Sequence, residues 1–416
     1  MGEQPELKSV EQHVADVLSV ISPLPVIELD LLDATGCVLA EEVRASTALP
    51  SFDNSSMDGY AVVAADVAEA SAERPARLPV VADIAAGDGS PHAIRPGMCA
   101  RIMTGAPLPA GADAIVPVEW TDGGTVHVEI RRPPPERTYI RRVGEDVRPG
   151  DVVATPGMRL GPAVVGLAAA VGRRSVRVRP RPRVVAMSTG SELTEPGQPV
   201  GHGAIWDSNS YMITAAARQL GCLGFRHGIV EDEPQAVLDA IDDQLVRADA
   251  LITSGGVSMG AHDVVKEVLS KSATMRFEKV AMQPGMPQGF GTIPGPGDDI
   301  TPIFTLPGNP VSSYVSFQLF VRPALRKMQG LDPGPLPTVR ATLTGPLRSP
   351  GGRRSFIRAR LEYTGSGYTA TPVGGQGSHQ LAALAAADCL VVVPEWVAKM
   401  GEGDDVDVMK LPGSEG

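Results

Sequence analysis

The sequence predicts a multidomain protein in which a doubly wound α/β domain lies between β-rich domains. The chain has 416 residues, enough for roughly two to four domains. Buried strands alternate with helical patterns from about residue 183 to residue 327, and short apolar runs interrupted by turn residues fill the segments on either side. The 46 glycines and 38 prolines agree with many turns and short strands.

The chain begins with a predicted helix. Ser9 and Gln12 have capping-box spacing, apolar residues recur at helical intervals over about 10–21, and two prolines just beyond end the helix. Residues 26–180 then have the pattern of a small-stranded β region. Its clearest apolar runs are Ala61–Val63, Leu78–Val81 and Val126–Ile130.

Strand and helix patterns alternate from Arg183 onward, which predicts a parallel, doubly wound sheet. The predicted strands are Val184–Met187, Phe225–Val230, Ala250–Thr253 and Ile303–Leu306. The predicted helices cover Ser208–Leu220 and begin at Pro234, at Val264 and at Pro310, the last with Asn309 as N-cap.

After Gly330 the pattern returns to β structure, and the frequent turns predict a small barrel or sandwich. The predicted strands here are Val339–Leu343, Ser355–Leu361, Tyr368–Pro372 and Cys389–Val393.

Composition excludes several functions. The net charge of −11 argues against general binding of nucleic acid or of an anionic membrane. The four cysteines lie far apart and form no C-x-x-C motif, which disfavours a zinc site and fits a reducing, cytoplasmic location. His262 and His379 have no partner at metal spacing and are interpreted as surface groups. The longest apolar stretch, Ala163–Val171, is too short to span a bilayer.

The ends of the predicted strands carry the candidate chemistry. Ser254–Gly260 is a glycine-rich turn before a helix, which suits a phosphate or another oxyanion and equally suits a tight structural turn. Glu192, Asp232 and Asp263 lie at neighbouring strand ends, where Mg²⁺ beside a phosphate would use one or two carboxylates. For Asp232 and Asp263, an ordinary acidic helix start is the alternative.

Six motifs, taken together and in order, resemble the molybdopterin molybdenumtransferase family, which includes MoeA and the gephyrin E domain. They extend along nearly the whole chain. The motifs are Phe52–Ala61, Arg101–Ala106, Ser188–Leu193, Ser254–Gly260 with Asp263, Leu306–Ser312 and Gly375–His379.

The resemblance implies four parts and a homodimer. The parts are a split linker domain (1–45 and 144–180), an inserted β domain (46–143), an α/β molybdopterin-binding-type domain (181–330) and a C-terminal β domain of barrel-like form (335–412). The implied reaction inserts molybdate into adenylyl-molybdopterin, requires Mg²⁺ and releases AMP. The active cleft would combine parts of both subunits, and the molybdopterin adenylyltransferase and molybdoenzymes are implied protein partners.

The resemblance also assigns site residues by position. The implied catalytic residues are Asp58, Thr104, Glu192, Asp232, Asp263 and Lys279, with Asp232 and Asp263 as the metal ligands. The implied substrate-binding residues are Ser254, Gly255, Gly256, Ser258, Gly260, Pro307, Pro310, Arg358 and Ser378.

One segment departs from the family pattern. Family members often carry K-P-G-K where this chain has Gln283-Pro284-Gly285-Met286, so two positive charges are missing from the implied oxyanion site. We therefore expect Arg358 and Lys279 to carry more of the molybdate binding. Two alternatives to the transferase remain: a gephyrin-like scaffold dimer, and a relative of the enzymes that adenylylate molybdopterin.

Overall fold

The computed structural model describes residues 7–135, 138–257, 264–271, 274–295 and 300–413. This part of the chain divides into two compact units, which we treat separately: residues 1–27, 36–38 and 178–416 form one, and residues 28–35 and 39–177 form the other. None of the helices in the described ranges combines the length and apolar content needed to cross a membrane.

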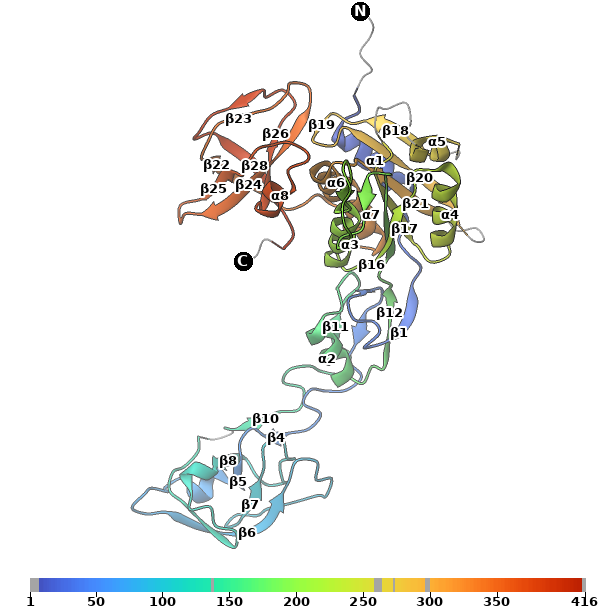
Figure 1. The fold of residues 1–416 in the computed structure, drawn as a ribbon. Coiled ribbons are helices and arrows are strands. Elements are labelled where there is room, and N and C mark those ends of the chain that lie inside the picture. The colour runs from blue at the N-terminus through green and yellow to red at the C-terminus, as the bar shows by residue number, and fades with distance from the viewer. Residues whose placement is uncertain (1–6, 136–137, 258–263, 272–273, 296–299, 414–416) are drawn as a thin grey trace, which may run out of the picture. The chain divides into compact units, whose positions relative to one another are not determined.

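The first unit contains the predicted α/β sheet, with strand order β16-β13-β17-β21-β20-β18 (Figure 1). Its first four strands run parallel, as predicted, and β20 and β18 add an antiparallel edge that the sequence analysis did not predict. The strands are β13 (Arg183–Thr189), β16 (Leu223–Val230), β17 (Ala250–Ser254), β18 (Arg276–Lys279), β20 (Pro287–Pro294) and β21 (Ile300–Leu306).

The unpredicted edge results from glycines in β20. A Cβ on Gly289 would lie 2.8 Å from the Phe277 ring, and one on Gly291 would lie 2.5 Å from the Met275 sulfur. Glycine lets these bulky side chains cross the strand closely. In the sequence the same glycines resemble a loop, which is why periodicity alone failed to find the strand.

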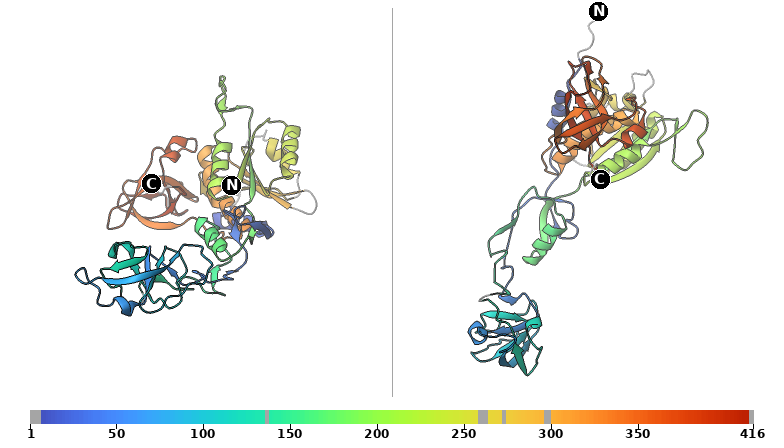
Figure 2. Two further views of the ribbon diagram at one scale, coloured as in Figure 1. Left: turned by 90° about the horizontal axis from the view of Figure 1, so that it is seen from below. Right: turned by 90° about the vertical axis from the view of Figure 1, so that its left-hand side faces the viewer.

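Helices cover both faces of the sheet (Figures 1 and 2). Along β13, Val184 and Ala186 pack in one core with α1, α3 and α7, whereas Val185 and Met187 pack in another with α4 and α5. This alternation is the doubly wound arrangement that the sequence predicts. The helices are α1 (Val10–Val20), α3 (Asn209–Gln219), α4 (Pro234–Leu245), α5 (Val264–Ser270), α6 (Pro310–Ser316) and α7 (Arg322–Met328), with a π-helical segment, η3 (Phe317–Val321), joining the last two.

The C-terminal part closes into the predicted barrel, in the order β24-β25-β22-β28-β26 with β26 pairing back to β24. A short strand from the α/β part, β19 (Met282–Gln283), adds in parallel to β24. The barrel strands are β22 (Thr338–Leu343), β24 (Arg354–Tyr363), β25 (Tyr368–Pro372), β26 (Cys389–Val393) and β28 (Asp405–Lys410). Two short strands, β23 (Leu347–Arg348) and β27 (Lys399–Met400), form a separate antiparallel pair.

The second unit holds a five-stranded sheet, in the order β8-β5-β7-β6-β9, and several two- or three-stranded pairings. The predicted apolar runs fall on β5 (Gly59–Val62), β6 (Ala76–Ile84) and β9 (His127–Ile130), and β7 (Cys99–Ile102) and β8 (Ala114–Pro117) complete the sheet. The shorter elements within this unit are β3 (Val43–Arg44), β4 (Asn54–Ser55), β10 (Ile140–Arg141), β11 (Val152–Ala154) and α2 (Pro162–Ala170). Three further strands include residues of both units: β1 (Ile27–Asp30), β2 (Val38–Leu39) and β12 (Ser175–Arg179).

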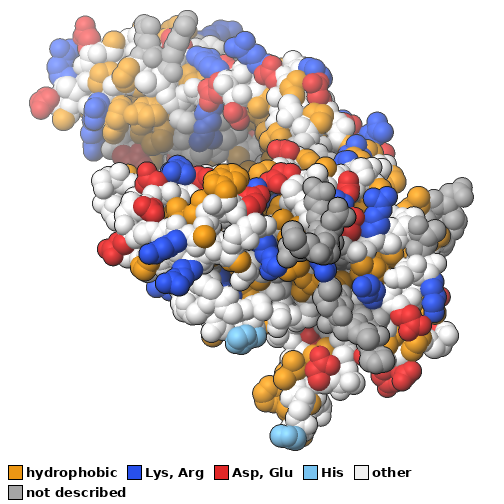
Figure 3. All heavy atoms as spheres, turned by 90° about the horizontal axis from the view of Figure 1, so that it is seen from above, with side chains coloured by type: hydrophobic (Ala, Val, Ile, Leu, Met, Phe, Trp, Pro, Cys, Tyr) orange, Lys and Arg blue, Asp and Glu red, His pale blue; other side chains and the backbone are white. Residues whose placement is uncertain are grey.

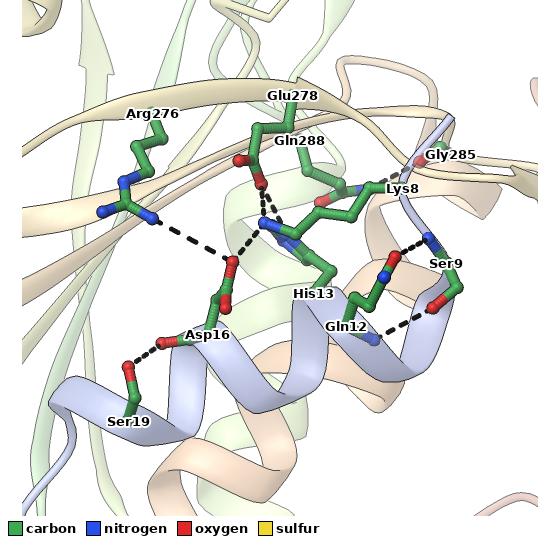
Figure 4. Close-up of polar contacts among 10 residues, drawn as sticks. All are labelled: Lys8, Ser9, Gln12, His13, Asp16, Ser19, Arg276, Glu278, Gly285 and Gln288. Atoms are coloured by element: carbon green, nitrogen blue, oxygen red, sulfur yellow. Dashed lines mark hydrogen bonds and ion pairs between the residues drawn. The ribbon is translucent and has the colours of Figure 1, made fainter. Parts of the chain in front are cut away.

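The N-terminal helix α1 differs from the expected division of domains. The capping box of Ser9 and Gln12 is formed, but Val17 and Ile21 pack in the α/β core instead of with residues 144–180. A polar cluster fastens the helix to β18: Glu278 accepts hydrogen bonds from Lys8 at 2.7 Å and pairs with His13 Nδ1 at 3.2 Å, and Asp16 also binds Lys8 (Figure 4). We attribute the different grouping to this apolar face and this cluster.

This cluster predicts a specific pH dependence. His13 is 3% exposed, and its burial lowers the pKa of the imidazole below the ordinary value, although the contact with Glu278 acts in the opposite direction. The unfolded chain therefore takes up a proton below about pH 6.5 that the folded chain resists. Stability present above that pH should fall as the pH decreases toward the lower folded pKa.

We expect His13→Gln to flatten this loss between about pH 6.5 and pH 5. The measurement is the urea unfolding midpoint across that range. His227→Gln, at an exposed position of β16, is the matched control. An unchanged slope in the His13 variant would show that another group causes the acid sensitivity.

Candidate active site

A cavity of about 740 Å³ lies at the carboxyl ends of β13, β17 and β21, where ligands bind in open α/β sheets. We call it the strand-end cavity. Its lining residues are Ser188, Thr189, Glu192, Leu193, Ile205, Trp206, Asp207, Ser208, Asn209, Ser254, Gly256, Val257, Pro287, Pro307, Gly308, Asn309, Pro310, His379 and Leu381.

The predicted Ser-Gly-Gly turn contributes Ser254 and Gly256 to the wall of this cavity, and its backbone conformation requires glycine. Gly255 and Gly256 have φ angles of +94° and +87°. A Cβ on Gly256 would lie 2.4 Å from the Cβ of Val265, and one on Gly255 would lie 2.8 Å from the carbonyl oxygen of Thr189. The turn therefore brings backbone against α5 and β13 at close range. Ser258, Gly260 and Asp263 lie outside the described residues.

Asn209 joins three walls of the cavity. From the first residue of α3, its Nδ2 donates to Ser254 Oγ at 2.7 Å and to the carbonyl of Gly308 at 2.6 Å. Its Oδ1 is buried and has no hydrogen-bond partner in the described structure. The amide thus fixes the Ser-Gly-Gly turn against the Pro307–Pro310 turn, and its Oδ1 is left as an unused hydrogen-bond acceptor.

A buried carboxylate, Asp207, stabilises the start of α3. It is 2% exposed and accepts hydrogen bonds from Ser188 Oγ at 2.9 Å and from Ser210, and Arg226 lies 3.5 Å away. Arg226 is shared with Glu195 at 2.7 Å. These contacts satisfy the charge and hold the N-terminus of α3, with its partial positive charge, toward the cavity.

An aromatic side chain also faces the strand-end cavity. Trp206 and Ile205 form β15 (Ile205–Trp206), which pairs with β14 (Leu193–Thr194), and they are 54% and 57% exposed. The indole Nε1 donates to the carbonyl of Gln198 at 2.9 Å, which fixes the ring. An exposed indole of fixed orientation can stack on a planar ring of a ligand. Asn209, Asp207 and Trp206 were not recognisable from the sequence, because none belongs to a motif of charged or glycine residues.

A second cavity, of about 430 Å³, lies between the β19–β20 connection and the loop before α8 (Leu381–Ala385). We call it the loop pocket. Its lining residues are Met282, Gln283, Pro284, Gly285, Met286, Ser312, Arg353, Gln376, Gly377, Ser378 and His379. His379, which the sequence analysis interpreted as a surface group, lines both cavities and so connects them.

The predicted substrate-binding residues are distributed over the strand-end cavity, the loop pocket and, for Arg358, the interior of the barrel part. Ser254, Gly256, Pro307 and Pro310 line the strand-end cavity, and Ser378 lines the loop pocket. Arg358 is 1% exposed and lines neither: its Nη2 donates to the carbonyl of Gly375 at 2.5 Å, and burial lowers the pKa of its guanidinium. Its contact therefore supports the loop that carries Ser378.

Among the predicted catalytic residues, Glu192 lines the strand-end cavity, and Asp232 is exposed just after β16, the neighbour of β13. Lys279 is half-buried at the end of β18 and lines neither cavity. In the described ranges, no three His, Cys, Asp or Glu side chains lie close enough together to hold a metal ion. One or two exposed carboxylates fit a Mg²⁺ ion that also takes phosphate oxygens from a substrate.

The other two predicted catalytic residues meet in the second unit. Asp58 Oδ1 accepts hydrogen bonds at 2.7 Å from both the backbone N–H and the hydroxyl of Thr104. These bonds, the backbone one foremost, lower the pKa of Asp58. The pair therefore presents an ionised carboxylate at an exposed turn.

Comparison with known proteins identifies the family. Three family models match in order: MoeA N-terminal region (domain I and II) over residues 8–172, the probable molybdopterin binding domain over 185–327, and MoeA C-terminal region (domain IV) over 340–411. Molybdopterin molybdenumtransferase 2 of Mycobacterium tuberculosis H37Rv is 45% identical over 412 residues, covering 97% of this chain and 100% of that protein. The Bacillus subtilis molybdopterin molybdenumtransferase is 35% identical, covering 92% and 89%.

Solved structures agree. The molybdopterin biosynthesis MoeA protein of Pyrococcus horikoshii matches with a TM-score of 0.76 and 30% identity, over 99% of this chain and 100% of that one. The chain belongs to the molybdopterin molybdenumtransferase family, as the six motifs indicated. It is a transferase of molybdenum cofactor biosynthesis.

The Ser-Gly-Gly turn gives a direct test of the strand-end cavity. We expect Gly256→Ala to destabilise the protein by at least about 1–3 kcal/mol, because the new Cβ requires a left-handed backbone and overlaps Val265. Gly201→Ala is the control, since a Cβ there meets nothing within 4 Å. The free energies of urea unfolding of the two variants should therefore differ clearly. Equal values would mean that the turn relaxes without cost.

Proposed function

We propose that the protein inserts molybdate into adenylyl-molybdopterin, releasing AMP and the molybdenum cofactor. One observation carries this proposal: two cavities of different size share His379. The larger has the size, the helix N-terminus of α3 and the fixed indole for an adenylylated, ring-containing substrate. The smaller is lined by hydroxyls, amides and one guanidinium, which suit a small oxyanion. Neighbouring cavities of these kinds would bring the two reactants together.

The strand-end cavity would hold the adenylyl phosphate. Backbone donors of the glycine-rich turn and the N-terminus of α3 would stabilise its negative charge. Asp232 and Asp263 would hold Mg²⁺, which neutralises charge on the phosphoanhydride oxygens when bound. Glu192 and Lys279 are the further proposed catalytic residues of this unit. The proposed substrate-binding residues are Ser254, Gly255, Gly256, Ser258, Gly260, Pro307, Pro310, Arg358 and Ser378.

Assembly and location belong to the same proposal. We place the enzyme in the cytoplasm as a homodimer, in which Asp58 and Thr104 of one subunit would complete the cleft of the other. The Asp58–Thr104 pair supports this role, because two hydrogen bonds fix a charged group at an exposed turn without an ion pair among the described residues. The adenylyltransferase that supplies the substrate and the molybdoenzymes that receive the product are the proposed partners.

The decisive experiment is incubation of the purified protein with adenylyl-molybdopterin, Mg²⁺ and molybdate. AMP is measured by chromatography, and the cofactor by reconstitution of an apo-molybdoenzyme. We expect AMP and active cofactor to form together and to require molybdate. ATP consumption with free molybdopterin would instead indicate the adenylyltransferase reaction. If the protein has neither activity, the scaffold alternative is favoured.

Asp232 tests the metal site. We expect Asp232→Asn to lower AMP release at least about tenfold at limiting Mg²⁺, a loss of about 1.4 kcal/mol, and to raise the Mg²⁺ concentration for half-maximal rate. Glu233→Gln is the matched control, because Glu233 is equally exposed and makes no side-chain cap at the start of α4. If both variants have the parental Mg²⁺ dependence, Asp232 is not a metal ligand.

Mixed subunits test the shared cleft. Asp58→Ala and Glu192→Ala homodimers should each be weakly active, because each lacks one proposed catalytic group in both clefts. After random exchange of equal amounts, about half of the dimers would be heterodimers with one intact cleft each, so AMP release should recover toward about a quarter of the parental rate. Sedimentation of the parent as a monomer, or no recovery after demonstrated exchange, would exclude an active cleft built from two subunits.

A further inference from the structure

A third cavity, of about 540 Å³, lies where α3, α6 and α8 meet residues 411–413. We call it the helix-side cavity. Apolar side chains form much of its wall, and two charged side chains also line it. The lining residues on which the argument depends are Met212, Tyr314, Leu381, Leu384, Arg360 and Asp388.

The helix-side cavity continues the strand-end cavity along the same three helices. On α3, Asn209 lines the strand-end cavity and Met212 lines the helix-side cavity. Pro310 and Tyr314 of α6 are divided in the same way, and Leu381 of α8 lines both cavities. Residues three or four apart lie one helical turn from each other, a rise of about 5.4 Å. The two cavities are therefore neighbours, and an elongated ligand can occupy both.

The apolar wall of the helix-side cavity suits a planar ring. Met212, Tyr314 and Leu381 pack, partly buried, against the core cluster that contains Leu384 and Leu411. Burial also raises the pKa of the Tyr314 phenol, which keeps this side chain neutral. A neutral and mostly apolar wall of this kind can contact the faces of a ring system without desolvating a charge.

The two charged side chains of this cavity retain hydrogen-bonding capacity for a ligand. Arg360 Nη2 donates to the carbonyl of Ala386 at 3.3 Å, and Asp388 Oδ1 accepts from the N–H of Leu361 at 2.8 Å. Neither side chain forms an ion pair with the described residues, although acidic and basic side chains are interspersed on the face seen in Figure 3. The cavity therefore offers a guanidinium donor and a carboxylate acceptor beside an apolar wall.

A 2-amino-4-oxopyrimidine ring has the complementary edge. Its amino group and the neighbouring ring N–H donate side by side, which suits a carboxylate, and its carbonyl oxygen accepts, which suits a guanidinium. Pterins and guanine carry this edge, whereas adenine has neither the carbonyl nor the adjacent ring N–H. Of the two ring systems in adenylyl-molybdopterin, only the pterin therefore matches the cavity.

We propose that the helix-side cavity binds the pterin ring system of adenylyl-molybdopterin, with Asp388 accepting from its amino and ring N–H groups and Arg360 donating to its carbonyl oxygen. This proposal rests on the proposed function, which supplies the substrate. It separates the two ring systems of that substrate. The adenine meets the fixed indole of Trp206 in the strand-end cavity, and the pterin lies one helical turn away.

Binding of 6-hydroxymethylpterin, followed by its own fluorescence anisotropy, tests the assignment without adenylyl-molybdopterin. We expect Asp388→Asn to weaken binding at least about tenfold, because an amide cannot accept from two adjacent donors as a carboxylate does. Asparagine retains the Oδ1 that accepts from Leu361. Arg360→Gln should weaken binding severalfold. Asp405→Asn is the matched control, since Asp405 is exposed on β28 of the same barrel and does not line the cavity.

Competition with nucleotides identifies the edge that is recognised. GMP carries the same edge as the pterin and should displace it from the parent protein, whereas AMP should displace it much more weakly. Equal displacement by AMP and GMP would show that the edge is not recognised and would overturn the assignment. Tighter binding of GMP than of the pterin would assign the cavity to a guanine nucleotide instead.

The variants also provide direct refutation. Absence of pterin binding by the parent, or parental affinity in both Asp388→Asn and Arg360→Gln, would overturn the assignment. If Asp388→Asn lowers the urea unfolding midpoint below that of the Asp405 control, Arg360→Gln decides the outcome, because Arg360 is exposed on β24 and its replacement leaves the core unchanged.

The AMP assay distinguishes this proposal from the proposed function. A pterin contact that is equal in the ground state and the transition state predicts that Asp388→Asn raises the KM for adenylyl-molybdopterin with little change in kcat. If the pterin binds elsewhere, this variant will keep the parental KM, and the transferase reaction stands. If the function itself is wrong, the parent will release no AMP from adenylyl-molybdopterin at any molybdate concentration.

Discussion

The parallel pairing of β19 with β24 is the constraint on which the loop pocket depends. It is only two residues long, yet it joins the α/β part to the barrel across a shared apolar core. In that core Val280 and Met282 pack with Phe356 and Leu390. Because the pairing fixes the register, Gln283 and Arg353 lie on one wall of the pocket, and the loop that carries Ser378 and His379 forms another.

The strand-end cavity depends on a different constraint, the packing of backbone against backbone. Gly255 and Gly256 bring the turn after β17 against β13 and α5, and Asn209 connects that turn to the next one at Gly308. An anion held here would be stabilised mainly by the partial positive charge at the N-terminus of α3. Such fixed dipoles need no counter-charge, so an acidic chain can build a local anion site against its overall field.

Sequence patterns predicted the helices and strands better than they predicted which of them pack together in the fold. Strand-and-helix alternation, the capping box at Ser9 and the barrel strands were recognisable because each depends on local spacing. The antiparallel edge of the sheet was missed because glycine-rich β20 has no strand pattern. Its glycines make room for Phe277 and Met275, which lie close against them. The family resemblance, not local spacing, grouped the N-terminal helix with residues 144–180, and in the structure Val17 of α1 is buried in the α/β core.

The same holds for the candidate site: motifs named several of its residues but did not predict the surroundings of each side chain. Motif resemblance named Glu192, Ser254 and Ser378, which line the two cavities. It also named Asp58 and Thr104, and the structure shows that they form a hydrogen bond across 46 residues of chain. The resemblance also assigned substrate binding to Arg358, which is buried and lines neither cavity. A guanidinium that is 1% exposed and donates to the carbonyl of Gly375 can orient the loop that carries Ser378. The burial of Arg358 follows from the alternation of side chains along β24 and from closure of the barrel, neither of which a motif records.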